Sequence, residues 1–262
     1  MTRQQTIRNT SIKQLYPLAL AEGEGVGTAY EYFAKRLVLR PWLKQLPPIK
    51  RLLIAGLPEK YGSSLDYLLL AEEMGATAVI IEDRPELLDK FQQSLAQAQA
   101  QGYLTAVQPQ LKQIPNLTQL SDLDAPFDLA ISNEVLQRLP AAERIAYGQV
   151  QMDASTAVAL FCPNADNPDH ANHSGLATLS LPELQSLSAI SSPSVTLSGY
   201  IDMPPFPTGV TRNEEQRVQA ESGALESFAM WGLGMYARLE KVLPAAVRRQ
   251  KSHIIYALLS GK

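Results

Sequence analysis

Short, nearly continuous apolar runs recur along the chain, and segments with apolar residues at helical spacing separate them. Strands that helices cover on both faces have runs of this kind. We expect such strands at "KRLLIAG" (50–56), "ATAVIIED" (76–83), "PFDLAISN" (126–133) and "STAVALFCPN" (155–164). We expect helices at 63–75, 84–102 and 140–152. This alternation predicts an α/β fold with a doubly wound, mostly parallel sheet and right-handed crossovers.

The third strand of this series has two candidate positions. "YLTAVQ" (103–108) has the β-branched and aromatic composition of a strand. "NLTQLSDL" (116–123) lies closer to the next strand and helix, and it serves equally well. We favour the second position by a small margin.

The two ends of the chain extend this core. Residues 1–48 are expected to form a helical segment, with a helix in "TAYEYFAKRLVLRPWLKQL" (28–46) that Pro47 and Pro48 end. Further along, "VTLSGYIDM" (195–203) predicts a strand, 221–243 a long amphipathic helix and "HIIYALLS" (253–260) a final strand. The last pair is expected to close the sheet with an antiparallel element, so that residues 49–262 form one domain.

Composition and charge narrow the class of protein. Of the 262 residues, 45% are hydrophobic and 19% charged, which is enough for one large core. The formal net charge is −3 and no basic cluster is interleaved with aromatic residues, which argues against nucleic acid as a partner. The sequence has no run of 18 apolar residues, so we predict a cytoplasmic protein without membrane contact. The single cysteine, Cys162, lies in a strand pattern and is interpreted as an inert buried thiol.

The segment after the first strand, "AGLPEKYGSS" (55–64), stands where a nucleotide cofactor needs a tight turn. Such loops usually follow GxGxxG or GxGxG, because glycine adopts positive φ and has no side chain to block close approach. Here Gly56 and Gly62 have Leu57 and Pro58 between them. Leu57 has a side chain and Pro58 lacks a backbone N–H donor, so this loop departs from the usual pattern. An ordinary connection from strand to helix is the alternative interpretation.

Four segments in this order resemble the class I S-adenosylmethionine-dependent methyltransferases. They are "RLLIAG", the acidic strand end "IIED", "FDLAISNEVLQRLP" and "VALFCPN", followed by the late strand pair. The third is the most specific, because that family often has an FDLV run followed by a short polar turn, "VL" and "LP". The resemblance covers residues 50 to 200, with "HIIYALLS" as the seventh strand. It implies a Rossmann-like, seven-stranded sheet and S-adenosylmethionine as the cofactor.

The resemblance also implies which residues of the first loop would contact the cofactor. Gly56 and Leu57 match the start of the family's glycine-rich loop around the methionine portion of the cofactor. Since the remaining glycines are missing, the usual contacts need a substitute. Either a longer and wider loop uses Gly62 as its last glycine, or Glu59 contacts the amino group of the cofactor.

Two further groups of residues match cofactor-binding positions of the family. Glu82 or Asp83 matches the acid that binds the ribose hydroxyls, and a carboxylate there is able to accept both of them as charge-assisted hydrogen bonds. A solvated strand end would have the same residues. Ser132, Asn133 and Glu134 match the segment after the fourth strand, which flanks the cofactor and the substrate.

The segment "PNADNPDHANHSG" (163–175) contains two of the three histidines. His170 and His173 have HxxH spacing, but the segment reads as a loop and lacks an HExxH pattern, so we predict no metal site. The loop follows the fifth strand, at the edge where open parallel sheets bind ligands. His170 or His173 is therefore a candidate general base. A polar surface loop with solvated histidines is the alternative.

A stiff, proline-rich stretch, "GYIDMPPFPTGVTRNEEQR" (199–217), follows the predicted strand at 195–203. Such a loop suits a pocket wall. Tyr200, Asp202, Phe206 and Arg212 are the candidates for substrate contact, and a packed connection is the alternative. His253 precedes the final strand and is interpreted as a structural residue.

Three functions are consistent with these observations. The first is transfer of a methyl group from S-adenosylmethionine to a small-molecule substrate, with Tyr30, Tyr32 and Phe33 forming a lid over the site. The second is a noncatalytic binding protein that has this fold without the cofactor. The third is an NAD(P)-dependent oxidoreductase, against which the incomplete glycine motif and the lack of a YxxxK pair argue.

Overall fold

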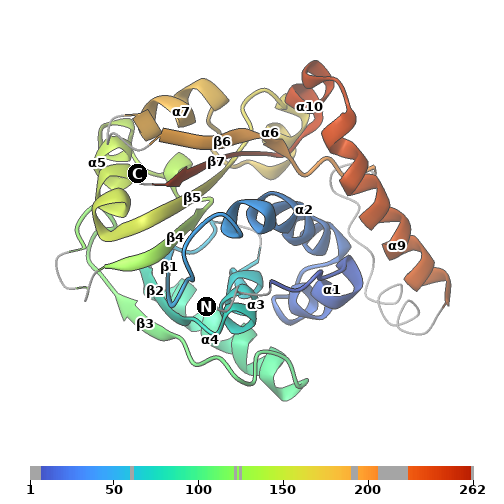
Figure 1. Ribbon diagram of the computed structural model, residues 1–262, viewed down its shortest axis with the longest axis horizontal. Helices are drawn as coiled ribbons and strands as arrows, with labels where there is room; N and C mark the ends of the chain where they lie inside the picture. The colour runs from blue at the N-terminus through green and yellow to red at the C-terminus, as the bar shows by residue number, and fades with distance from the viewer. Residues whose placement is uncertain are drawn as a thin grey trace.

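The computed structural model describes residues 7–59, 62–120, 123, 126–189, 194–205 and 224–260. Within them, seven strands form one sheet in the order β3-β2-β1-β4-β5-β7-β6 (Figure 1). The strands are β1 (Arg51–Ala55), β2 (Thr77–Glu82), β3 (Gln110–Gln113), β4 (Phe127–Asn133), β5 (Ser155–Pro163), β6 (Ser194–Ile201) and β7 (Ile254–Ser260). β1 to β5 pair in parallel, whereas β7 is antiparallel to β5 and β6. The predicted Rossmann-like, mostly parallel seven-stranded sheet with an antiparallel C-terminal strand is confirmed.

Helices cover both faces of the sheet (Figure 1). They are α1 (Ile12–Ala21), α2 (Val26–Leu43), α3 (Leu65–Met74), α4 (Pro85–Ala100), α5 (Ala141–Ala154), α6 (Pro168–Ser174), α7 (Leu181–Ala189), α9 (Ala224–Leu239) and α10 (Ala245–Lys251), with the 3-10 turns η1 (Leu136–Arg138) and η2 (Glu240–Val242). Successive residues of a strand point to opposite faces. Leu52 and Ile54 accordingly pack in the core with α2, α3 and α4, and Leu53 and Ala55 in the core with α5 and α7.

The third strand lies at neither of the two expected positions. β3 occupies Gln110–Gln113, between the two candidate segments, and pairs with β2 from Val79↔Gln110 to Glu82↔Gln113. It is an edge strand of four residues, none of them buried. A strand of this kind has no apolar run to mark it, so the hydrophobic pattern of the sequence pointed to its neighbours instead.

The segment at 163–175, expected to be a loop, contains the short helix α6. The Asn167 side chain caps this helix by accepting a hydrogen bond from the His170 N–H (3.1 Å). Pro168 occupies the first helical turn, and Gly175 ends the helix with φ 67°. Asparagine before proline and a closing glycine are typical of helix boundaries as well as of turns. The prediction of a loop took them as turn residues only.

The N-terminal helices form a third core outside the sheet. Buried residues of α1 and α2 pack with Met230 and Ala237 of α9, and α9 lies beside α1 and α2 at one end of the molecule (Figure 1). No helix in the described part of the chain is long and apolar enough to cross a membrane.

Tyr147 ties helix α5 to the sheet directly beneath the carboxyl ends of β1 and β4. Its buried hydroxyl donates to the Ala55 carbonyl (2.6 Å) and lies 2.8 Å from Ser132 Oγ. We expect Tyr147→Phe to lower the free energy of unfolding by about 1 to 2 kcal/mol, because a buried acceptor loses its partner. Urea denaturation measures the change. Tyr103→Phe, at a side chain that is 38% exposed, is the control and should have almost no effect.

Candidate functional site

Three residues after strand ends have a backbone conformation that is unusual for side chains other than glycine. Ser64 follows β1 (φ 70°), Glu134 follows β4 (φ 54°) and Asp202 follows β6 (φ 65°). All three strands run in the same direction through the sheet, so their carboxyl ends share one edge. Open α/β sheets bind ligands at this edge, and strained backbone is concentrated at functional sites. This edge is therefore the candidate site.

The turn after β1 is closely packed against the segment after β4. Gly56 has φ 81°, and a Cβ atom there would lie 2.8 Å from the Val135 side chain. A glycine is thus required at this position. Leu57 is buried, and its N–H donates to Glu82 Oε2 (2.6 Å). This turn, which the sequence predicts to bind a cofactor, is fixed in this structure by contacts with Val135 and Glu82.

Glu22, from the N-terminal segment, caps the first turn of α3. Its Oε1 accepts hydrogen bonds from the N–H groups of Ser63 and Leu65 (2.9 Å each), and Tyr32 donates its hydroxyl hydrogen to Oε2. Gly62 has φ 69°, and the Tyr32 hydroxyl fills the place that a Cβ would take. Burial raises the pKa of Glu22 to about 7, against the lowering effect of the hydrogen bond from Tyr32.

The aromatic residues expected to form a lid have different partners. Tyr32 contacts the loop after β1, as described above. Tyr30 donates its hydroxyl hydrogen to Glu240, and Phe33 packs beneath the Arg238 guanidinium (4.9 Å to the ring centre). Tyr30 and Phe33 thus join α2 to η2 and α9.

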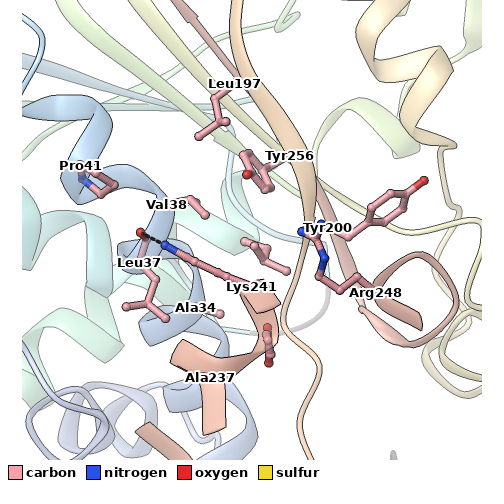
Figure 2. A pocket seen from close by; sticks show the side chains of 12 residues that line it. Ala34, Leu37, Val38, Pro41, Leu197, Tyr200, Ala237, Lys241, Arg248 and Tyr256 are labelled. Carbon is pink, nitrogen blue, oxygen red and sulfur yellow. Dashed lines mark hydrogen bonds between the residues drawn. The ribbon is translucent and has the colours of Figure 1, made fainter. Parts of the chain in front are cut away.

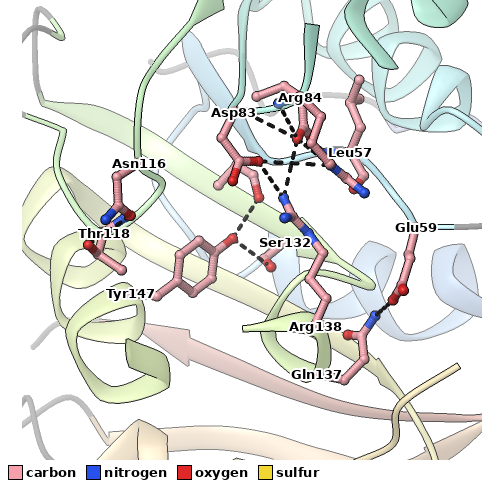
Figure 3. A network of polar contacts seen from close by, with 12 residues as sticks. Leu57, Glu59, Asp83, Arg84, Asn116, Thr118, Ser132, Gln137, Arg138 and Tyr147 are labelled. Atoms are coloured by element: carbon pink, nitrogen blue, oxygen red, sulfur yellow. Dashed lines mark hydrogen bonds and ion pairs between the residues drawn. The ribbon is translucent and has the colours of Figure 1, made fainter. Parts of the chain in front are cut away.

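Glu82 ends β2 in a site with no solvent access, where it accepts hydrogen bonds from several donors. Figure 3 shows Leu57, Arg84 and Arg138 of this network close together. The donors are the N–H groups of Leu57, Asp83 and Arg84 and the guanidinium groups of Arg84 (2.7 Å) and Arg138 (3.2 Å). A carboxylate has about four lone-pair positions, so this group is saturated. Glu82 therefore fixes the loop after β1, the end of β2 and η1 to one another.

Asp83, the next residue, faces outward. Its side chain is 25% exposed and pairs with Arg138 (2.8 Å). Although burial acts to raise it, the hydrogen bond and the positive charge of Arg138 help to lower the pKa of Asp83 to about 2. Of the two carboxylates predicted for the ribose, Asp83 is the one that remains open to a ligand.

The segment after β4 contains buried polar atoms without a hydrogen-bond partner. Asn133 Oδ1 and Gln137 Oε1 are in this state, as is Ser64 Oγ in the loop after β1. Each of these side chains is at most 3% exposed. Buried polar groups in native proteins are nearly always paired. Ser64, Asn133 and Gln137 lie near the carboxyl ends of β1 and β4, and buried polar atoms without a partner also occur elsewhere in the described residues, such as Gln151 Nε2 and Ser155 Oγ.

A second polar cluster lies between α2 and α3. Lys35 has no solvent access and is paired with Glu31 (3.0 Å) and Asp66 (3.7 Å), and its ammonium group lies 4.8 Å from the centre of the Tyr67 ring. Burial disfavours the charged ammonium, but the charges of Asp66 and Glu31 prevail and raise the pKa of Lys35 well above its usual value. The sequence analysis missed this cluster, because its residues lie in helical patterns that resemble ordinary amphipathic faces.

His253, interpreted from the sequence as a structural residue, lies at the same edge of the sheet as the candidate site. Its Nδ1 lies 3.1 Å from Asp202 Oδ2, and its ring stacks on His170 at a centroid distance of 4.0 Å and an angle of 11°. The antiparallel direction of β7 places His253, just before the strand, at the carboxyl edge of β5. Because the sequence already predicted an antiparallel final strand, it also indicated this position of His253.

The other predicted site residues are distributed as follows. His170 is half-buried against His253, whereas His173 is exposed at the end of α6. Tyr200 donates to Asp166 (3.1 Å), which is also paired with Arg249 (2.7 Å). Two further candidates, Phe206 and Arg212, lie outside the described residues. Substrate contact by any of these side chains stays a prediction.

Two predictions concern metal and thiol chemistry. Among the described residues, no group of three or more His, Cys, Asp and Glu side chains is arranged to hold a metal ion. Cys162 is buried in β5, and burial raises the pKa of its thiol well above the usual value. A thiol of this kind is a poor nucleophile.

A cavity of ≈ 260 Å³ lies between α2, β6, β7 and the segment from α9 to α10 (Figure 2). Its walls are mainly apolar, with Leu37, Val38 and Leu197 among them. Ile201 and Glu240 also line it. Ile201 directly precedes Asp202 in the sequence, and the negative charge of Asp202 acts on Glu240. This cavity therefore borders the candidate site on the side of β6.

Comparisons with solved structures identify the architecture. The methyltransferase domain of a bacterial Hen1 protein (CtHen1) aligns with a TM-score of 0.52 and 13% identity, over 87% of this chain and 97% of that one. A S-adenosylmethionine-dependent methyltransferase from Clostridium acetobutylicum aligns with a TM-score of 0.50 and 7% identity, over 88% and 91%. This chain has the fold of the class I S-adenosylmethionine-dependent methyltransferases. No family model matches the sequence, and no curated protein matches it significantly.

Within this methyltransferase fold, the described polar residues lie at the carboxyl ends of β1, β2 and β4 on one side, and at the carboxyl ends of β5 and β6 and the start of β7 on the other. Identities of 7% and 13% mean that the likeness lies in the backbone and not in the side chains.

The raised pKa of Glu22 predicts a pH-dependent stability. Between pH 4.5 and about 7 the folded protein keeps Glu22 protonated while the unfolded chain ionises it, so stability falls as the pH rises and levels off above 7. We expect wild type to lose roughly 2 to 3 kcal/mol more than Glu22→Gln between pH 5 and pH 8. Urea denaturation at both pH values measures this. Glu86→Gln, on the exposed face of α4, should follow wild type.

Proposed function

We propose that this protein transfers a methyl group from S-adenosylmethionine to a small-molecule acceptor. The observation that carries the proposal is the group of orphaned buried acceptors, Ser64 Oγ, Asn133 Oδ1 and Gln137 Oε1, at the ends of β1 and β4. A methyltransferase fold binds its ligands at this edge. Burying such atoms without partners is costly, which supports a bound ligand with hydrogen-bond donors.

The residues present fit the cofactor in chemical type. Asp83 offers a partly exposed, ionised carboxylate for the ribose hydroxyls, and Asn133 offers a buried acceptor for an amino group. Glu82 would act indirectly, by holding the Leu57 N–H and the turn in place. When bound, S-adenosylmethionine supplies a methyl group activated by its sulfonium. The chain's own contribution would be to align the acceptor and exclude water, for which no covalent residue is needed.

A second candidate function is binding without catalysis. The specific observation in its favour is the saturation of Glu82 by Arg84 and Arg138, together with the packed turn at Gly56. In this alternative the protein's own guanidinium groups have replaced a ligand at the end of β2. The net charge of −3 favours a small molecule over nucleic acid in either case.

Calorimetric titration separates the two functions. We expect S-adenosylmethionine and S-adenosylhomocysteine to bind with micromolar dissociation constants, and NAD, the control ligand, to give no heat. Binding of neither adenosyl compound would favour the noncatalytic function. Binding of NAD alone would favour the oxidoreductase considered from the sequence.

The assignment of Asp83 to the ribose has its own test. We expect Asp83→Asn to weaken S-adenosylhomocysteine binding by about tenfold or more, because a charge-assisted hydrogen bond contributes roughly 1.5 to 3 kcal/mol. The same titration measures the change. Asp89→Asn, at an exposed carboxylate of α4, is the matched control. Equal affinity of the two variants would remove Asp83 from the site.

A further inference from the structure

We infer that the cavity between α2, β6, β7 and the segment from α9 to α10 is a second ligand site, which binds a small amphiphilic carboxylate. The cavity lies against one face of the sheet, whereas the candidate cofactor region lies at the carboxyl edge of β1, β2 and β4. The inference therefore goes beyond the proposed methyl transfer and does not depend on it.

Two apolar walls enclose the cavity (Figure 2). One wall is a single face of α2, on which four residues recur at helical spacing: Ala34, Leu37, Val38 and Pro41. The other wall is the sheet. Leu197 and Ile201 of β6 lie on the same face as Tyr256 of β7, because Gly199, between them, pairs with Tyr256. A Cβ at Gly199 would lie 3.3 Å from the Tyr256 ring, so this glycine leaves room for the ring to lie flat along the wall.

Part of this apolar surface is open to water. Leu197 is 42% exposed although it lies within a strand, and Pro41 is exposed on the opposite wall. Apolar surface gains free energy when an apolar group covers it, and concave apolar surface is the usual lining of small-molecule sites. The two walls therefore favour a ligand with a hydrocarbon body.

Lys241 places a positive charge at the mouth of the cavity. Pro41 has no backbone N–H, so the Leu37 carbonyl, four residues earlier in α2, lacks its helical donor. Lys241 Nζ donates a hydrogen bond to that carbonyl (3.0 Å). The proline thus creates the acceptor that fixes the ammonium group beside the apolar wall. Partial burial lowers the pKa of Lys241, and a nearby anion would offset this effect.

Arg248 of α10 supplies a second positive charge. Its side chain is half-buried, and its Nε has neither solvent access nor a hydrogen-bond partner. The neighbouring Arg249, by contrast, is exposed and pairs with Asp166 (2.7 Å). Within the described part of the chain, no acidic side chain forms an ion pair with Lys241 or Arg248. A buried donor of this kind is satisfied when a ligand supplies an acceptor.

Glu240 is the acidic residue of the lining, and its carboxyl group has other partners. It accepts hydrogen bonds from the Tyr30 hydroxyl and from the Met203 N–H (2.9 Å). Burial raises its pKa to about 7, so near neutral pH a large fraction of Glu240 is uncharged. The two cations therefore dominate the charge of the cavity, which selects an anionic head group.

The volume of the cavity sets the size of the ligand. It measures ≈ 260 Å³. Because one water molecule takes up about 30 Å³ of the liquid, the cavity holds roughly nine non-hydrogen atoms. A planar carboxylate matches the donors on Nε and Nη of a guanidinium group in a bidentate arrangement. A saturated acid of about eight carbon atoms fits both this volume and this pair of cations.

Calorimetric titration of the full chain tests the site, with octanoate as the probe. Octan-1-ol and octylammonium have the same hydrocarbon body with a neutral or a positive head group. We expect octanoate to bind with a dissociation constant below 1 mM and the other two to bind about tenfold more weakly or not at all. The titrations are made at two temperatures, because the heat of apolar binding changes with temperature.

Two variants locate the binding. Arg248→Gln should weaken octanoate binding by about tenfold or more, because it removes the charged donor, and Arg249→Gln, at the exposed neighbour, should match wild type. Leu197→Trp should abolish binding by filling the cavity from its exposed wall. Circular dichroism checks that each variant is folded. If Arg248→Gln does not fold, Leu197→Trp and the comparison of the three ligands on wild type decide the question.

The outcomes separate this site from the proposed function. Absence of octanoate binding, equal binding of octanoate and octan-1-ol, or unchanged octanoate affinity in Leu197→Trp overturns the site. Saturating S-adenosylhomocysteine should change the octanoate affinity by less than twofold, and competition between the two would overturn a separate site. Failure of both adenosyl compounds to bind would overturn methyl transfer and leave the octanoate result standing.

Discussion

The carboxylate of Glu82 is the constraint on which the candidate site depends. It lies without solvent access at the end of β2 and accepts hydrogen bonds from the turn after β1, from its own turn and from η1. A buried charge is stable only when it is paired in this way, and loss of one partner leaves an uncompensated charge. Glu82 therefore couples three connections at the edge of the sheet where the candidate site lies. The hydrogen bonds of this one side chain fix the positions of the three connections relative to one another.

Much of the fold was predictable because buried strands have an unmistakable composition. β1, β2, β4 and β5 were found from apolar runs, and the late pair β6 and β7 from strand-like segments near the end of the chain. β3 was not found, since an edge strand of four residues is selected by its pairing with β2 and not by burial of its own side chains. The short helix α6 was missed for a related reason: its cap, Asn167, is also a common turn residue.

The sequence predicted the position of the candidate site, but not which of its side chains pair with one another. The sequence indicated Glu82 and Asp83 correctly as the end of a strand, yet the saturation of Glu82 involves Arg138, which is 56 residues away. The sequence pattern around Glu82 does not indicate a contact with Arg138. The pairing of Asp202 with His253 likewise depends on the antiparallel register of β6 and β7. Sequence patterns report which side chains are buried, whereas long-range pairing decides which polar groups meet.

The cap that Glu22 places on α3 has a consequence for the order of folding. The N–H groups of Ser63 and Leu65 find their acceptor in a residue more than 40 positions earlier in the chain, on the far side of α2. The loop after β1 cannot complete its hydrogen bonds until α1 and α2 have docked against α3. Contacts of this sequence separation form late, because the intervening chain must first be ordered. We therefore expect the N-terminal helices and the loop after β1 to become ordered together during folding.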